Sequence, residues 1–182
     1  DYLIKPVNPN QILLTLKKLI HRREIVAEVT QTAYQQQFQQ LGMQIMDCRT
    51  WNDWADLYRQ LVRWELQLSA TDSAMADMLR MQKEEANIGF TKFVKKNYLG
   101  WLGEREVMMS PDVFKQEIFP RLSAGEKIFL IVLDNFRYDQ WKTIETEFAD
   151  FEIDEQLYCS ILPTATQYAR NAIFSGLMPD QI

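Results

Sequence analysis

The amino-acid sequence predicts a chain of mixed class, in which the C-terminal end of one α/β domain, an α-helical connector bundle and the start of a second α/β domain follow one another. Three observations support this prediction. Residues 1–7 have the pattern of a strand end followed by a loop, residues 9–119 show mainly helical spacing of apolar side chains, and residues 127–133 form a continuous apolar run. We expect the three parts to span residues 1–21, 22–122 and 123–182.

Composition limits the classes of function. Nearly half of the 182 residues are hydrophobic and a quarter are charged, which is typical of a soluble globular protein. The net charge of −5 disfavours a general nucleic-acid-binding surface, and no apolar run is long enough to cross a bilayer. Two cysteines and no export signal favour a cytoplasmic, reducing environment. The chain starts at Asp1 in an apparent strand and stops at Ile182 just after a helix, so we expect a fragment of a longer protein.

The first half of the chain predicts long helices. Asn8 can cap free amides and Pro9 suits a first helical position, so a helix is expected to begin there. It continues to about Asp47 through the glutamine-rich residues 31–40, whose polarity predicts a solvent-exposed connector rather than a core helix. Thr50 is expected to cap the next helix. The apolar side chains of that helix lie three and four apart and predict a packed seam: Trp54, Leu57, Leu61, Trp64 and Leu68.

Two more helices complete the expected bundle, at residues 73–98 and 112–119, the second ending near Pro120. The pattern then changes at residues 123–125. Residues 127–133 are rich in branched apolar side chains, which suits a strand buried on both faces.

The expected strand is followed by a helix with apolar side chains on one side: Trp141, Ile144 and Phe148. A second strand is expected between residues 151 and 162. A short helix then spans residues 166–175, with Gly176 as its stop signal. The alternation of strand and helix predicts the opening of an α/β domain.

The N-terminal motif is DYLIKPVNP. Taken alone, Lys5 and Pro6 are explained as a surface lysine and a loop proline. With the amphipathic helix that follows, the motif resembles the end of response-regulator receiver domains. The resemblance implies that Lys5 contacts the phosphoryl group of a phosphorylated aspartate, a role that suits a compact ammonium group.

Two further motifs contain groups that could act on phosphate. Asp134 directly follows the expected strand at residues 127–133, and a carboxylate there is a hard oxygen ligand for a divalent cation. Capping of the next helix is an equally good explanation of Asp134. Thr166 lies near a helix start, where free amides favour a phosphate and a metal could activate the hydroxyl. Helix capping by Thr164 or Thr166 is the simpler alternative.

Together these two motifs resemble the alkaline phosphatase superfamily, in which an aspartate after a strand precedes Pro-Thr-x-Thr at a helix start. The Asp-x-x-Arg-Tyr-Asp sequence beginning at Asp134 is similar to the PglZ branch. The resemblance implies that Thr166 is the nucleophile and a metal ligand, and that Asp134 is a ligand of the same site, which holds two zinc ions in the complete protein. The only histidine, His21, is expected to be a surface or linker residue, so other ligands must come from elsewhere.

The order of the three parts resembles response regulators of the PorX type, which are associated with control of type IX protein secretion. The resemblance implies a zinc-dependent phosphodiesterase output acting on nucleotide or oligonucleotide phosphodiesters. It also implies a sensor histidine kinase, a sigma factor or other transcription regulator as partners, and a homodimer formed on phosphorylation. The alternative is a non-catalytic PglZ domain that serves as a protein-interaction module. We expect the 182-residue chain alone to be inactive.

Overall fold

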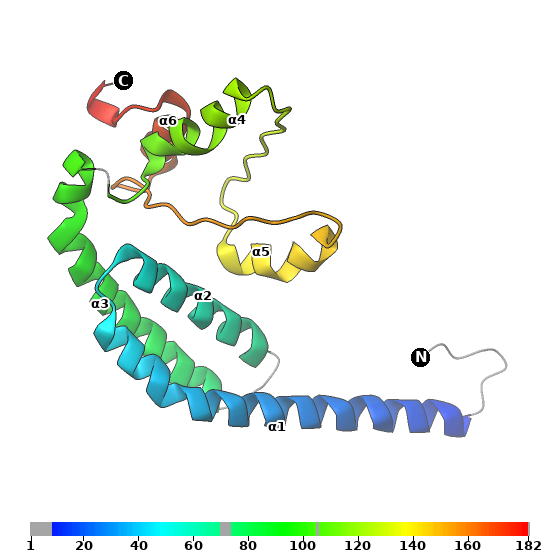
Figure 1. The fold of residues 1–182 in the computed structure, drawn as a ribbon. Coiled ribbons are helices and arrows are strands. Elements are labelled where there is room, and N and C mark those ends of the chain that lie inside the picture. The colour runs from blue at the N-terminus through cyan, green and yellow to red at the C-terminus, as the bar shows by residue number, and fades with distance from the viewer. Residues whose placement is uncertain (1–8, 70–73, 105, 182) are drawn as a thin grey trace. The chain divides into compact units, whose positions relative to one another are not determined.

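The computed structural model of the chain describes residues 9–69, 74–104 and 106–181 (Figure 1). The chain divides into two compact units, Asp1–Phe90 and Thr91–Ile182, and helix α3 (Ala74–Glu104) contributes residues to both. The first unit is a helical bundle, as predicted for the connector. Within the described ranges, no helix is both long enough and apolar enough to cross a membrane. The predicted strand end at residues 1–7, with Lys5, lies outside the described residues.

Helix α2 (Trp51–Leu68) begins and packs as its sequence predicts. Thr50 is the N-cap: its hydroxyl accepts from the Asp53 amide at 3.2 Å, and the Asp53 carboxylate accepts from the Thr50 amide at 2.8 Å. This reciprocal pair satisfies two amides that the helix itself cannot. The predicted seam is confirmed, because all five of its side chains are buried: Trp54, Leu57, Leu61, Trp64 and Leu68.

Helix α1 (Pro9–Asp47) is continuous, but the prediction that it is an exposed connector is wrong for its second half. Its first half carries exposed apolar side chains, up to 59% for Leu14, and extends beyond α2 and α3 in the first unit (Figure 1). Its second half buries Tyr34, Leu41 and Ile45. These side chains lie seven and four residues apart and form one narrow stripe. The surrounding glutamines conceal that stripe in the sequence.

A buried polar network joins α1 to α3. The Tyr34 hydroxyl donates to Gln82 Oε1 at 2.7 Å, and Gln82 Nε2 donates to the Phe38 carbonyl at 2.8 Å. Burial raises the pKa of Tyr34 to about 12, so the phenol remains a donor at physiological pH. Both side chains are buried and have little access to water, so each needs a hydrogen-bond partner in the core. Tyr34 and Gln82 meet this need for each other.

In the second unit, the predicted helix at residues 112–119 is three short pieces: η1 (Ser110–Asp112), the π-helical turn η2 (Phe114–Ile118) and α4 (Phe119–Ser123). Pro120 does not end a helix, as the sequence predicted, but lies in the first turn of α4. A proline is tolerated there because its missing amide would have no partner in the helix.

The two predicted strands are not seen as strands. Residues 127–133 have no regular structure, and Phe129 and Ile131 are 93% and 78% exposed. A strand requires neighbours for its amides and carbonyls, and no described segment pairs with this one. In the predicted strand at residues 151–162, a parallel bridge joins Cys159 to Met109. The α/β arrangement is therefore not shown in the described part of the chain.

The remaining helices follow the sequence. Helix α5 (Tyr138–Ile144) continues into the 3₁₀ turn η3 (Glu145–Phe148), and the rings of Trp141 and Phe148 lie 5.4 Å apart. Helix α6 (Thr166–Ser175) has the predicted bounds. Gly176 follows it with φ of 65°, a left-handed conformation that glycine adopts without strain. A last 3₁₀ turn, η4, spans Pro179–Gln181.

Candidate functional site

Helix α6 is held firmly against the segment that precedes α4. Ala169 and Ala172 are buried on the face that contacts η1, and Ala172 is fully buried. At the other end of α6, Lys115 Nζ donates to the Gly176 carbonyl at 2.7 Å, and the rings of Phe114 and Phe174 lie 5.4 Å apart. These contacts fix the helix along its length, so the residues at its start are presented by a rigid support.

The segment that leads into α6 is anchored by backbone hydrogen bonds. The Cys159 amide donates to the Met108 carbonyl at 2.9 Å, and the Ile161 amide donates to the buried Ser110 hydroxyl at 3.1 Å. The Leu162 amide donates to the Tyr98 hydroxyl of α3 at 2.7 Å. The chain therefore reaches Pro163 and the start of α6 along a defined path.

Thr166 is the first residue of α6 and is exposed. The N-cap is Ala165, with no side-chain capping hydrogen bond, so neither Thr164 nor Thr166 caps the helix in this structure. The capping alternative from the sequence is therefore not what the structure shows. The first amides of the helix and the Thr166 hydroxyl lie together at the positive end of the helix dipole.

Asp134 lies in a turn that follows the apolar run at residues 127–133. Its Oδ1 accepts from the Asn135 amide at 3.0 Å, and Asn135 has a left-handed φ of 57°, which asparagine tolerates better than most residues. Helix α5 starts later, with Arg137 as its N-cap. Asp134 therefore does not cap that helix, and its side chain is 58% exposed.

One ion pair brings the two motifs together. Asp134 Oδ2 lies 3.9 Å from Nη1 of Arg170, which stands four residues after Thr166 on α6. Residues four apart on a helix share a face. The carboxylate after the apolar run therefore lies beside the first turns of the helix that begins with Thr166. Arg170 was not among the site residues that the sequence predicted, although its spacing from Thr166 was visible in the sequence.

The neighbouring charges, Arg137 and Asp139, satisfy each other. The Arg137 guanidinium donates to both carboxylate oxygens of Asp139, at 2.9 and 2.6 Å. These hydrogen bonds hold the pKa of Asp139 below its ordinary value. The Arg137 guanidinium is thus held by two hydrogen bonds to Asp139. Arg170, by contrast, has a single long contact with Asp134.

The donor atoms of Asp134 and Thr166 are of the hard oxygen type that divalent cations accept. They are only part of a ligand set, since the described residues contain no group of three or more His, Cys, Asp and Glu side chains that could hold a metal. Both side chains are exposed. The two residues therefore fit a metal site to which further ligands contribute.

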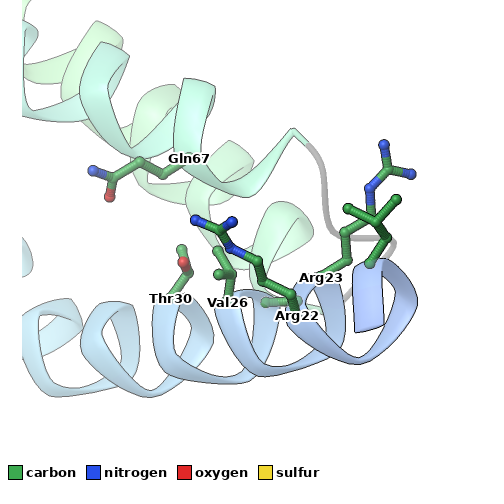
Figure 2. A pocket seen from close by; sticks show the side chains of 7 residues that line it. Arg22, Arg23, Val26, Thr30 and Gln67 are labelled. Carbon is green, nitrogen blue, oxygen red and sulfur yellow. The ribbon is translucent and has the colours of Figure 1, made fainter. Parts of the chain in front are cut away.

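A separate concave surface in the first unit is lined by α1 and α2 and has a volume of about 630 Å³ (Figure 2). Arg22, Val26, Thr30 and Gln67 lie around it, with the Arg22 side chain directed toward α2. It contains none of the site residues that the sequence predicted. Lys5, the predicted phosphoryl-sensing residue, lies outside the described residues.

Two family models match the chain in tandem. Residues 24–102 match the PorX response regulator linker domain, and residues 113–182 match the BREX system PglZ alkaline phosphatase-like domain. No curated protein matches the chain.

A response-regulator linker followed by an alkaline phosphatase-like domain defines the class of protein: a response regulator whose output domain is of the alkaline phosphatase type. Within that class, the linker match is specific to one type. The two matches together support a fragment of a PorX-type response regulator. The predicted boundaries at residues 21/22 and 122/123 remain predictions.

Proposed function

We propose that this chain is part of a phosphorylation-controlled regulator whose output domain is a zinc-dependent phosphodiesterase, acting on nucleotide or oligonucleotide phosphodiesters. The observation that supports it most directly is the Asp134–Arg170 ion pair, which brings the carboxylate beside the helix that Thr166 begins. The match of residues 113–182 to an alkaline phosphatase-like domain supports the same chemistry. In this proposal the exposed run at residues 127–133 is a strand of the complete domain's sheet.

Thr166 is the proposed nucleophile. Its Oγ forms a bond to phosphorus, the bond between phosphorus and the leaving alkoxide breaks, and the leaving oxygen takes the electron pair and a proton. The hydroxyl proton of Thr166 passes to solvent. A water oxygen then attacks the same phosphorus, the bond to Thr166 Oγ breaks, and the threonine regains a proton. The products are an alcohol and a phosphomonoester.

The residues of this chain contribute in distinct ways. Helix α6 orients the Thr166 hydroxyl and directs its first amides toward the phosphoryl oxygens, where the helix dipole favours negative charge. Asp134 is the proposed zinc ligand of this chain, with Thr166 as a second. Zinc held by these two residues would lower the pKa of the threonine hydroxyl and neutralise phosphoryl charge. Two ions are proposed for the complete protein, with the other ligands supplied by residues outside the described part.

Signalling follows from the linker. The match to a PorX response regulator linker supports a role in two-component signalling, and we propose a sensor histidine kinase as the source of the phosphoryl group. Lys5 is proposed to contact that group in the receiver domain. We also propose that the protein forms a homodimer on phosphorylation. Its proposed partner is a sigma factor or another transcription regulator, and its proposed role is control of type IX secretion.

Zinc content and the hydrolysis rate of bis(p-nitrophenyl) phosphate, measured on the full-length protein, test the site. Thr166→Ala is expected to lower the rate about a thousandfold or more, because the nucleophile is gone, and to keep at least part of the zinc. Asp134→Ala is expected to lose zinc first and the rate with it. Thr164→Ala is the matched control, since it removes a threonine of the same motif outside the proposed site.

A wild-type rate in Thr166→Ala would remove the nucleophile assignment. Normal zinc content in Asp134→Ala would remove the ligand assignment. If the wild-type protein binds no zinc and hydrolyses no diester, the output domain is the non-catalytic interaction module instead.

A further inference from the structure

Arg170 pairs with Asp134 in this structure, and the sequence supplied no role for it. Its Nη1 lies 3.9 Å from Asp134 Oδ2, and the two side chains are 50% and 58% exposed. A distance of 3.9 Å is at the outer limit of an ion pair. By contrast, the Arg137–Asp139 pair has two contacts, at 2.9 and 2.6 Å. Arg170 is therefore the less firmly held of the two guanidinium groups.

Helix geometry determines what Arg170 can reach. Side chains on an α-helix lean toward its N-terminus, so a long side chain at the fifth position extends back over the first turn. That turn contains Thr166 and the first free amides. Since Ala169 and Ala172 are buried against η1, α6 is prevented from rotating. The backbone positions of Thr166 and Arg170 relative to each other are therefore set by α6, while the exposed Arg170 side chain stays free to turn.

A divalent cation and a guanidinium group cannot share the Asp134 carboxylate without repulsion. A cation that binds Asp134 would therefore weaken the pair with Arg170, whose exposed side chain is able to turn. At the start of α6, the partner that a free guanidinium group matches best is a phosphoryl group, because its donor fork fits two oxygens of a phosphate.

We propose that Arg170 has two alternative partners: the Asp134 carboxylate when no cation is bound, and the non-bridging oxygens of the phosphoryl group on Thr166 or the substrate when a cation occupies Asp134. This rests on the proposed function and adds a phosphoryl-binding residue to it. Arg170 balances the carboxylate in the empty site and then joins the helix amides in holding the anion.

Two binding measurements on the full-length protein test the proposal. Zinc affinity is measured by competition with a chromogenic chelator, and the affinity for inorganic phosphate is measured by calorimetry on zinc-loaded protein. Arg170→Gln is expected to tighten zinc binding two- to fivefold, because the competing cation is gone, a range typical of exposed ion pairs. It is expected to weaken phosphate binding about tenfold or more, because a hydrogen bond between charged groups is lost.

Two other variants complete the set. Arg170→Lys keeps the positive charge, so zinc affinity is expected to stay near that of the wild type while phosphate binding weakens by less than in Arg170→Gln. Arg121→Gln is the matched control: Arg121 is 54% exposed and pairs with Glu126 at 3.7 Å, and neither affinity is expected to change. Thermal unfolding of each variant verifies that it folds.

Either of two results overturns the proposal: zinc affinity in Arg170→Gln that is unchanged or weaker, or phosphate affinity equal to that of the wild type. The proposed function fails separately, through Asp134. If Asp134→Ala binds zinc as the wild type does, the ligand assignment is wrong whatever Arg170 does. If Asp134→Ala loses zinc while Arg170→Gln changes nothing, only the role of Arg170 is wrong.

Discussion

At the scale of single residues, Gly89 shows how closely α3 approaches α2. A Cβ atom added at Gly89 would lie 2.8 Å from Cη2 of Trp54, well inside van der Waals contact. Trp54 is buried, and its ring lies 5.6 Å from that of Phe90. The glycine therefore makes room for the largest side chain of the α2 seam, and no local turn requires it because it lies inside α3.

Gly89→Ala is accordingly expected to lower the free energy of unfolding, by about 1–3 kcal/mol, because overpacking outweighs the gain in helix propensity. Gly100→Ala is the control on the same helix. An added Cβ there meets nothing within 4 Å, so only the propensity gain of about 1 kcal/mol remains and the protein is expected to be stabilised. Chemical denaturation of both variants measures the difference. Equal effects of the two substitutions would contradict this account of Gly89.

The residues of the candidate site were partly predictable. Asp134 and Thr166 were named because an acid after an apolar run and a threonine at a helix start are local patterns. Arg170 was missed because its significance depends on Asp134, which lies 36 residues earlier and is brought near only by folding. Residue type and spacing thus identify candidates, whereas pairing between distant segments becomes visible only in the structure.

At the scale of elements, the last turns of α3 contact the segment that leads into α6. The Tyr98 hydroxyl accepts a hydrogen bond from the Leu162 amide at 2.7 Å. Tyr98 falls within the match to the response regulator linker, and Leu162 within the match to the alkaline phosphatase-like domain. A change in the position of these α3 turns would therefore act directly on the segment just before Thr166.

Tyr98→Phe is expected to speed amide hydrogen exchange in peptides covering residues 159–166, because the Leu162 amide loses its acceptor. The loss in stability is expected to be small, about 0.5–1.5 kcal/mol, since Leu162 is exposed and water replaces the phenol. Tyr168→Phe serves as control, because it removes a hydroxyl from the first turns of α6 and leaves this hydrogen bond intact. Unchanged exchange in Tyr98→Phe would show that the contact does not hold the segment.

Elements defined by local pattern were predicted well, and elements defined by distant partners were not. Thr50 and Gly176 mark helix ends through their own chemistry, and both predictions are confirmed. Residues 127–133 have the composition of a buried strand, but strand formation depends on neighbours that the described residues do not supply. The Tyr34 stripe was overlooked because composition averaged over residues 31–40 hides a narrow buried face.

At the scale of the whole molecule, we propose a different role for each of the two segments that match a family model. The linker would relay the state of a receiver, and the alkaline phosphatase-like domain would act on phosphodiesters. The exposed apolar side chains of the first half of α1 are consistent with contacts outside the described residues, since a soluble helix seldom leaves so many uncovered.

Lys5→Ala in the full-length protein is expected to uncouple phosphorylation from dimerisation, because it removes the ammonium group that we propose contacts the phosphoryl group. Sedimentation velocity of phosphorylated and unphosphorylated protein measures the change in oligomeric state. Lys17→Ala, on the exposed half of α1, is the control and is expected to keep the response. A normal response in Lys5→Ala would remove the phosphoryl-sensing role.

The stereochemical course at phosphorus tests the central claim, that Thr166 attacks the diester and is released by water. Each in-line displacement inverts the phosphorus centre, so two successive displacements restore its configuration. Full-length, zinc-loaded protein would hydrolyse a chiral phosphorothioate diester in ¹⁸O-labelled water, and the configuration of the product would be determined by NMR. Retention is the predicted result. Inversion would mean that water attacks the substrate directly, and the role of Thr166 as nucleophile would be wrong.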